Sequence, residues 1–152
     1  MSDRHRLKHD GWLVIADGEK ALFLRNEGDE KFPNLEVFRE LEQENPPNRE
    51  QAANRPGRFN DGTNVHRSAV ADTDWHRLEK ERFAKDIGGR LYKHAHANRF
   101  SDLLLVASPM ILGEIRKELH DEVKSRVVGE VDKDLTNHPV DKIEALVLHS
   151  EG

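Results

Sequence analysis

The 152-residue sequence contains no cysteine, which excludes disulfide frameworks, thiolate zinc sites and cysteine nucleophiles. Long apolar runs are also missing. The longest are Trp12–Ala16 and Leu103–Ala107, far short of the roughly 20 residues that cross a bilayer. The first nine residues are mostly polar and lack the apolar core of a secretory signal. We therefore expect a cytoplasmic protein that does not bind a membrane.

Apolar side chains are fewer than usual and charged ones are abundant. Hydrophobic residues make up 36% of the chain and charged residues 35%, compared with about 25% charged in an average protein. The 24 Lys and Arg against 29 Asp and Glu give a net charge of −5. This balance argues against a general nucleic-acid coat protein and still allows a local basic patch. The length fits one domain over residues 1–152.

Three apolar runs near the N-terminus predict an antiparallel meander over residues 12–16, 20–25 and 35–41. Asp17-Gly18 between the first two runs is a hairpin signal, because a type I′ turn needs a positive φ at both central residues. The third run alternates, which predicts a half-exposed strand with Leu35, Val37 and Arg39 on one face and Glu36, Phe38 and Glu40 on the other.

The C-terminal half alternates between helical and strand patterns. Helical spacing predicts a helix over 74–98, capped by Thr73 or Asp74, with an inward stripe of Trp75, Leu78, Ala84, Ile87, Leu91 and Ala95. Gly88-Gly89 would weaken its centre, so we expect a close-packed contact there. Strands over 102–107 and 127–131 alternate with helices that begin at Ser108-Pro109 and at Pro139.

The resulting order is β-β-β-α-β-α-β-α. Helical crossovers make the later strands parallel and the connections right-handed. The prediction is therefore an α/β fold of ribonuclease-H-like architecture, with a mixed five-stranded sheet covered by three helices.

Between Glu42 and Thr73 the periodic pattern disappears and Asn, Pro, Gly and Arg dominate. We interpret residues 42–73 as a long flexible loop between the third strand and the first helix; such loops are usually functional or disordered. The helical segment that follows, 77–99, carries seven Lys or Arg against three Asp or Glu. A loop containing arginines next to a basic helix could follow a phosphate backbone, whereas the alternative is a solvated face with i,i+4 ion pairs.

Catalytic and metal motifs are weak. Nucleases of this architecture hold acids within the first strand and at the end of the fourth, and neither place is acidic here. The hairpin accounts for Asp17, which leaves Asp132 and Asp134 as the obvious acids at the carboxyl ends of parallel strands. His94 and His96 lie on different sides of the predicted helix and cannot share an ion. We expect no metal and no cofactor.

Five motifs occur in an order that resembles a known family. They are Ile15–Ala21, Arg55–Arg58, Glu81–Ala84, Ala107–Arg116 and Lys133–Thr136. The chain resembles the bacterial host attachment proteins ("protein required for attachment to host cells") from about Gly11 to Leu148. That family is similar to the middle domain of archaeo-eukaryotic peptide release factors, which implies the same ribonuclease-H-like topology and contact with RNA or the ribosome.

In the release factors, the loop before the long helix carries a catalytic Gly-Gly-Gln tripeptide. The corresponding segment here has none, since Gln43 and Gln51 do not follow glycine pairs. We therefore expect a non-enzymatic domain. The resemblance implies a link to host attachment, and without a secretory signal we expect that link to be indirect.

The leading hypothesis is an RNA-binding or ribosome-binding domain that uses the basic loop and helix. The expected phosphate or carboxylate partners are Arg55, Arg58, Arg67, Arg82, Lys85 and Lys93, and Gly57 and Gly62 would allow close backbone approach. One alternative is a protein-interaction module that acts indirectly in bacterial attachment. A second is a metal-dependent hydrolase built around Asp132 and Asp134.

Overall fold

The computed structural model describes the backbone of residues 4–43 and 62–149, and the side chains of residues 4–43 and 77–149. Five strands form one sheet in the order β3-β2-β1-β4-β5. They are β1 (Trp12–Ala16), β2 (Lys20–Asn26), β3 (Leu35–Glu42), β4 (Leu103–Ala107) and β5 (Val127–Val131). β1, β4 and β5 are parallel neighbours, whereas β2 pairs antiparallel with β1 and β3. The prediction of a mixed five-stranded sheet in an α/β protein is confirmed.

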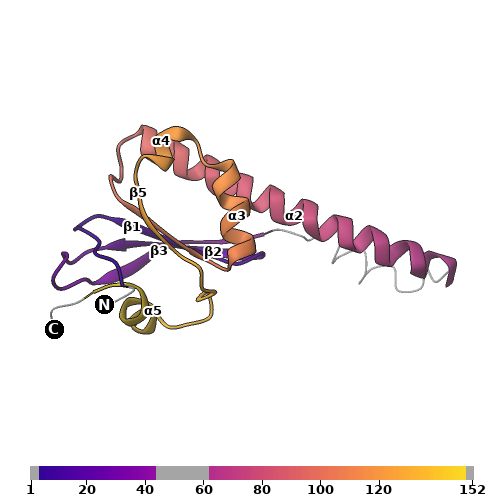
Figure 1. Cartoon of the computed structure of the whole chain (residues 1–152), viewed down its shortest axis with the longest axis horizontal. Coiled ribbons are helices and arrows are strands. Elements are labelled where there is room, and N and C mark those ends of the chain that lie inside the picture. The colour runs from indigo at the N-terminus through magenta and orange to yellow at the C-terminus, as the bar shows by residue number, and fades with distance from the viewer. Residues whose placement is uncertain (1–3, 44–61, 150–152) are drawn as a thin grey trace.

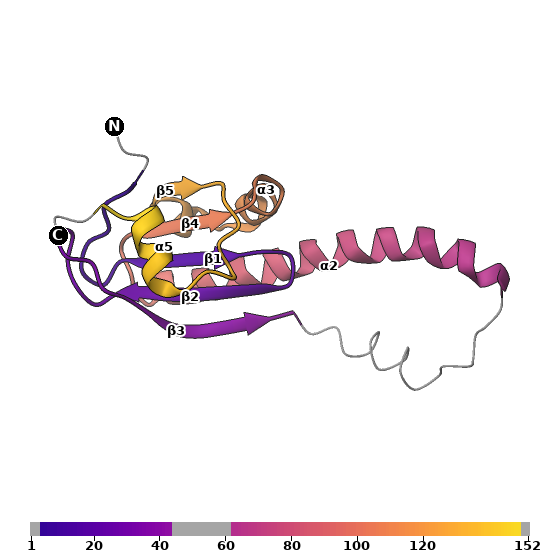
Figure 2. The same cartoon turned by 90° about the horizontal axis from the view of Figure 1, so that it is seen from below.

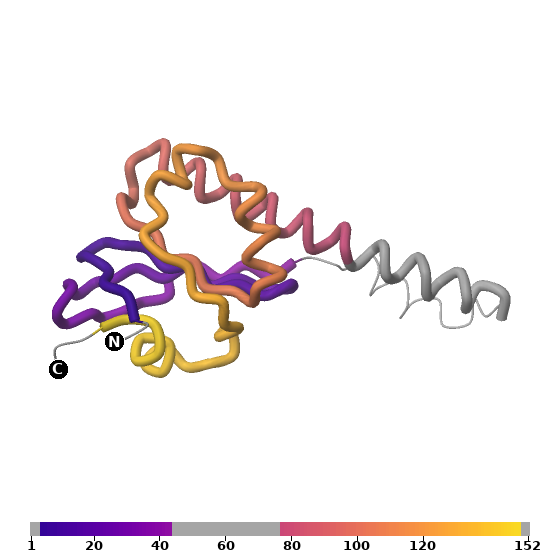
Figure 3. The backbone as a smooth tube through the Cα atoms, in the orientation of Figure 1, coloured from indigo at the N-terminus to yellow at the C-terminus, as the bar shows by residue number. Residues whose placement is uncertain are grey.

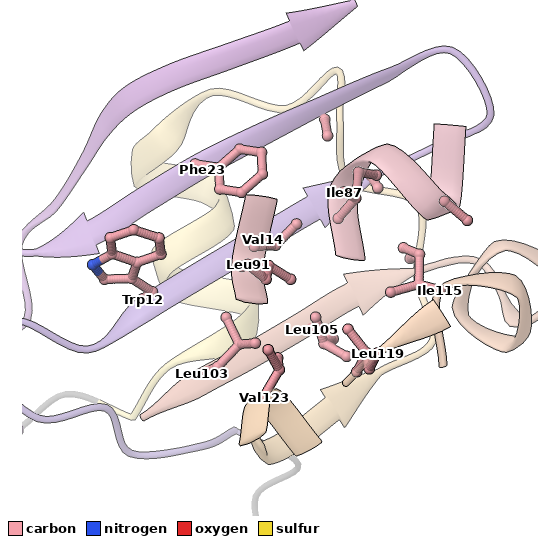
Figure 4. Packing of buried hydrophobic residues seen from close by; sticks show 14 of the residues in the cluster. Trp12, Val14, Phe23, Ile87, Leu91, Leu103, Leu105, Ile115, Leu119 and Val123 are labelled. Carbon is pink, nitrogen blue, oxygen red and sulfur yellow. The ribbon is translucent and has the colours of Figure 1, made fainter. Parts of the chain in front are cut away.

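Helices cover both faces of this sheet. α2 (Gly62–His96), α3 (Pro109–Glu118) and the short α4 (Asp121–Lys124) lie on one face, and α5 (Val140–Val147) lies on the other (Figure 1). The first face packs Trp12, Val14 and Phe23 of the sheet against Ile87 and Leu91 of α2 (Figure 4). On the second face, Leu13 and Ile15 pack with Ile143 and Val147. Alternate residues of β1 thus serve two cores, which explains why the whole strand is apolar.

The long helix begins at Gly62 rather than at residue 74. Residues 62–73, expected in the loop, are therefore helical, and neither Thr73 nor Asp74 is a cap. The chain has no proline between Pro56 and Pro109, and lengthening an established helix costs far less than starting one. The remainder of the predicted loop, residues 44–61, lies outside the described part of the chain.

One residue of the predicted inward stripe of α2, Leu78, does not face the sheet. Leu78 is 46% exposed, whereas Ala84, Ile87, Leu91 and Ala95 are buried. At 3.6 residues per turn, Leu78 lies about 140° around the helix from Leu91, so it does not share the face that contacts the sheet. The side chain of Trp75 lies outside the described residues.

The β1–β2 hairpin is present but its turn is not type I′. Ala16 pairs with Ala21, and in the described part of the chain no glycine has a positive φ. Instead, Oδ1 of Asp17 accepts hydrogen bonds from the backbone N–H groups of Glu19 and Lys20, each at 2.7 Å. The aspartate side chain therefore supplies the turn's hydrogen bonds itself.

The predicted alternation of β3 is interrupted by a bulge. Phe23 of β2 pairs with Arg39, but Leu24 pairs with Val37, so Phe38 is an extra residue. Arg39 therefore shares the α2 face of the sheet with Phe23, rather than lying with Leu35 and Val37 as the alternation predicted. Phe38 contacts Trp12 and Phe23 on this same face. A bulge has no reliable signature in a single sequence, which is why the pattern missed it.

The two glycines at the centre of α2 behave differently. A Cβ built on Gly88 would lie 2.6 Å from the carbonyl oxygen of Glu118 in α3, whereas one on Gly89 would meet nothing within 4 Å. The predicted close contact is confirmed at Gly88 only.

The two ends of the described chain lie side by side. The N–H of His5 donates to the carbonyl oxygen of Val147 at 2.7 Å, and the N–H of His149 donates to that of His5 at 2.8 Å. Figure 3 shows this N-terminal segment running beside the end of α5. Leu7 adds its side chain to the α5 side of the core.

Candidate nucleic-acid interface

The outer face of α2 carries three of the residues predicted to bind a polyanion. Arg82, Lys85 and Lys93 are all exposed. At about 100° per residue they fall within an arc of roughly 80°, and Arg82 and Lys93 are separated by about 16 Å along the axis. Ile87 and Leu91, on the opposite side of the helix, are buried against the sheet. Figure 2 shows α2 running along the sheet and extending well beyond it. Because the buried side of the helix packs on the sheet, the row of cations lies on the side that faces away from it.

The two lysines of this row are not paired with acids in the described residues. Asp86 lies beside the row but pairs with Arg90, with Nε and Oδ1 3.1 Å apart. Neither Lys85 nor Lys93 forms an ion pair with a carboxylate in the part of the chain that the structure describes. The exposed face of α2 therefore has an excess of positive charge in a protein of negative net charge.

The other predicted binding residues have a different status. Gly62 is the first residue of α2 rather than a loop glycine, and Arg67 lies in the same helix with only its backbone described. Arg55, Gly57 and Arg58 lie outside the described residues.

Cations also gather around His94, near the end of α2. Burial lowers the pKa of His94, and the positive charges of Arg99, Arg39, Lys93 and Arg90 lower it further. Nη1 of Arg99 lies 3.4 Å from Nδ1 of the His94 ring. These cations come from α2, from the turn after it and from β3, so the fold rather than the sequence brings them together.

Aromatic rings lie next to these cations. The ring centroids of Trp12 and His94 are 5.1 Å apart, and those of Trp12 and Phe38 are 4.7 Å apart. Trp12 is buried beneath the surface, whereas Phe38 is 41% exposed. The guanidinium carbon of Arg25 lies 6.0 Å from the centre of the Phe38 ring.

We refer to this surface as the Phe38 patch and define it by Phe38, Arg39, Lys93, His94 and Arg99. Lys93 also belongs to the row of cations on α2, so the two features are continuous. Of its members, only Lys93 was predicted to bind. Phe38 and Arg39 could not be predicted because their position depends on the β3 bulge. The sequence pattern suggests only a metal-binding role for His94, and excludes it.

A separate polar cluster lies where the parallel strands end. The hydroxyl oxygen of Thr136 lies 2.8 Å from Oδ2 of Asp17 and 2.9 Å from Oδ1 of Asp134. A hydroxyl has one proton and can donate to one of these carboxylates at a time. Because both oxygens of Asp17 are engaged, the cluster ties the β1–β2 turn to the segment after β5. Among the described residues, no three His, Asp or Glu are placed to hold a metal ion.

No helix in the described segments is both long and apolar enough to pass through a bilayer. The charged, amphipathic α2 is the longest of them.

A family model matches most of the chain. The family model for bacterial archaeo-eukaryotic release factor family 12 matches residues 10–147. RP470, an uncharacterised protein of Rickettsia prowazekii (strain Madrid E), is 35% identical over 72 residues, which cover 46% of this chain and 48% of that protein. The matched segment thus spans about half of that relative's length.

Among solved structures, one described as an archaeal protein is 12% identical, with a TM-score of 0.47. The alignment covers 88% of this chain and 32% of that one. None of these three descriptions mentions attachment to host cells.

Proposed function

Because the chain belongs to the bacterial archaeo-eukaryotic release factor family 12, we propose that it is a translation-associated domain that binds the RNA of the ribosome through the outer face of α2. The membership supports a role in translation, and the placement of charge on α2 supports RNA as the partner. This proposal places the domain in the cytoplasm, where ribosomes act.

The strand order supports the finer assignment of the fold. The sheet runs β3-β2-β1-β4-β5, with only β2 reversed. This arrangement agrees with the ribonuclease-H-like architecture proposed from the sequence. The sheet and the packed face of α2 then form a rigid support for the basic surface.

The observation that carries the proposal is the row of Arg82, Lys85 and Lys93 on an exposed helix face. Lysine and arginine contacts to phosphates release condensed counterions, which favours binding without reading the base sequence. Of the acids near the row, Asp86 is already paired with Arg90. A phosphate backbone could therefore contact the row without displacing an ion pair of Lys85 or Lys93.

The proposal does not include hydrolysis of peptidyl-tRNA. The sequence has no Gly-Gly-Gln, and its Gly88-Gly89 pair is followed by Arg90 within α2. Gly88 is moreover needed for packing against α3. We propose a binding role without catalysis.

Co-sedimentation with purified ribosomes and filter binding to deproteinised ribosomal RNA, each over a salt series, test the proposal. We expect association at low salt that weakens steeply as salt increases. An absence of association with both at low salt would contradict the proposal.

The alternative from the family resemblance is a protein partner through which the domain acts indirectly in bacterial attachment to host cells. It predicts capture of a defined protein that is insensitive to salt and to nuclease. The same pull-down with and without ribonuclease separates the two functions.

A further inference from the structure

We propose that the Phe38 patch is a stacking site for an unpaired nucleobase, so that the domain prefers single-stranded RNA to duplex RNA. This inference rests on the proposed RNA binding and specifies the class of RNA recognised. It concerns residues of β3 and of the end of α2. Of the cation row, only Lys93 belongs to the patch, whereas Arg82 and Lys85 lie further from it along the helix.

The bulge in β3 gives the patch its unusual composition. Consecutive residues of a regular strand point to opposite faces of the sheet. Because Phe38 is the extra residue of the bulge, Phe38 and Arg39 lie together on the α2 side. An aromatic ring and a guanidinium thus stand next to each other at the edge of the sheet. Bulges often redirect side chains in this way at functional sites.

The Phe38 ring packs against two aromatic neighbours, has the Arg25 guanidinium carbon 6.0 Å from its centre, and is still partly exposed. Trp12 packs against it at a centroid distance of 4.7 Å, and Phe23 makes an edge contact at 6.3 Å. Even so, 41% of Phe38 remains exposed. A ring that is held in place by its neighbours and still partly exposed is a suitable platform for a base, because every base has a π face and stacking needs no particular sequence.

Cations outnumber acids around the ring, which favours an anionic occupant; among the described residues, the unpaired acid on this face of β3 is Glu36, opposite Arg25. In the described part of the chain, Arg39, Lys93 and Arg99 form no ion pair with a carboxylate, and the Arg99 guanidinium contacts the ring of His94. Other nearby arginines are already neutralised, since Arg25 pairs with Glu27 at 2.7 Å and Arg90 pairs with Asp86. Phosphates on either side of a stacked base would complement the three remaining cations.

An aromatic platform beside unpaired cations distinguishes among polyanions. In a duplex the bases are already stacked inside the helix and cannot reach Phe38, whereas the bases of a single strand can turn outward. Polyphosphate supplies charge but has no base. Preference for the single strand over both of these polymers is therefore the specific consequence of stacking.

The test measures the binding of three probes at one salt concentration. The probes are a short single-stranded oligoadenylate, the duplex of that strand with oligouridylate, and inorganic polyphosphate. Phe38→Leu keeps most of the apolar packing against Trp12 and removes the π face. Phe32→Leu is the matched control, because Phe32 is 60% exposed and makes no ring contact with the patch among the described residues.

We expect Phe38→Leu to weaken binding of the oligoadenylate about tenfold and to leave binding of the duplex and of polyphosphate unchanged. Phe32→Leu should change none of the three. In a Trp75→Phe background, where Trp12 is the only tryptophan, the oligoadenylate should also alter Trp12 emission, and Phe38→Leu should reduce that change.

Equal loss with all three probes, or no loss with the oligoadenylate, would overturn the stacking site while leaving the proposed RNA binding intact. If the unmodified protein bound neither oligoadenylate, duplex nor ribosomal RNA, the proposed function itself would be wrong.

Discussion

The hydroxyl of Thr136 lies 2.8 Å from Oδ2 of Asp17, across 119 positions of sequence. This contact joins two of the motifs that carry the family resemblance, Ile15–Ala21 and Lys133–Thr136. It holds the β1–β2 turn against the segment that follows β5. Asp17 thus acts within the fold, both in its own turn and in this contact.

Thr136→Val should destabilise the protein by about 1–2 kcal/mol, because a buried hydroxyl that bonds a carboxylate is replaced by a methyl group of similar size. Urea denaturation followed by circular dichroism measures the change. Thr136→Ser keeps the hydroxyl and should recover part of the loss. If valine and serine were equally destabilising, the hydroxyl and its contacts with Asp17 and Asp134 would contribute nothing.

The adjacent glycines of α2 offer a paired test of helix packing. Gly88→Ala should destabilise the protein by about 1–3 kcal/mol, because the new Cβ would overlap the carbonyl oxygen of Glu118 and push α3 away. Gly89→Ala should stabilise it by up to about 1 kcal/mol, since alanine favours the helix and nothing lies within 4 Å. The midpoint temperature of thermal unfolding should therefore fall for Gly88→Ala and rise for Gly89→Ala. Shifts of the same sign would show that α2 and α3 do not pack as described.

The His94 ring should report on the cations of the Phe38 patch. Burial and the charges of Arg99, Arg39, Lys93 and Arg90 lower its pKa, so Lys93→Gln should raise it. Lys85→Gln is the control, because Lys85 is not one of the charges that lower this pKa and its loss should leave it unchanged. Titration of the ring by NMR measures both variants.

RNA bound at the patch should raise the pKa of His94, because phosphate favours the protonated ring. Binding then takes up a proton, and affinity should increase as the pH falls through the interval between the free and bound pKa. The same NMR titration with and without oligoadenylate checks the shift. A bound-state pKa equal to or below that of the free protein would show that phosphate lies elsewhere.

Elements with strong local patterns were predictable from the sequence. The uniformly apolar runs 12–16 and 103–107 could only be buried strands, and Ser108-Pro109 and Pro139 correctly indicated where helices begin. The start of α2 was missed because residues 62–73 lack an apolar stripe, and their helical state depends on continuing a helix that is stabilised elsewhere.

Only part of the candidate site could be predicted from the sequence, because the rest depends on tertiary structure. Arg82, Lys85 and Lys93 share a face because helical spacing is regular, so their arrangement could be predicted. The grouping of Arg39 with His94 depends on a bulge and on the packing of β3 beside α2, which are tertiary features. The contact between Thr136 and Asp17 likewise requires the folded sheet.

The most direct test of RNA binding through α2 is the salt dependence of affinity for a single-stranded RNA, compared between two triple variants. One replaces Arg82, Lys85 and Lys93 with glutamine, and the control makes the same change at the exposed residues Lys31, Lys117 and Lys142. Each lost phosphate contact should reduce the slope of log affinity against log salt by about 0.7. We predict a slope smaller by about 2 for the α2 variant and an unchanged slope for the control; equal slopes in the two variants would contradict binding through α2.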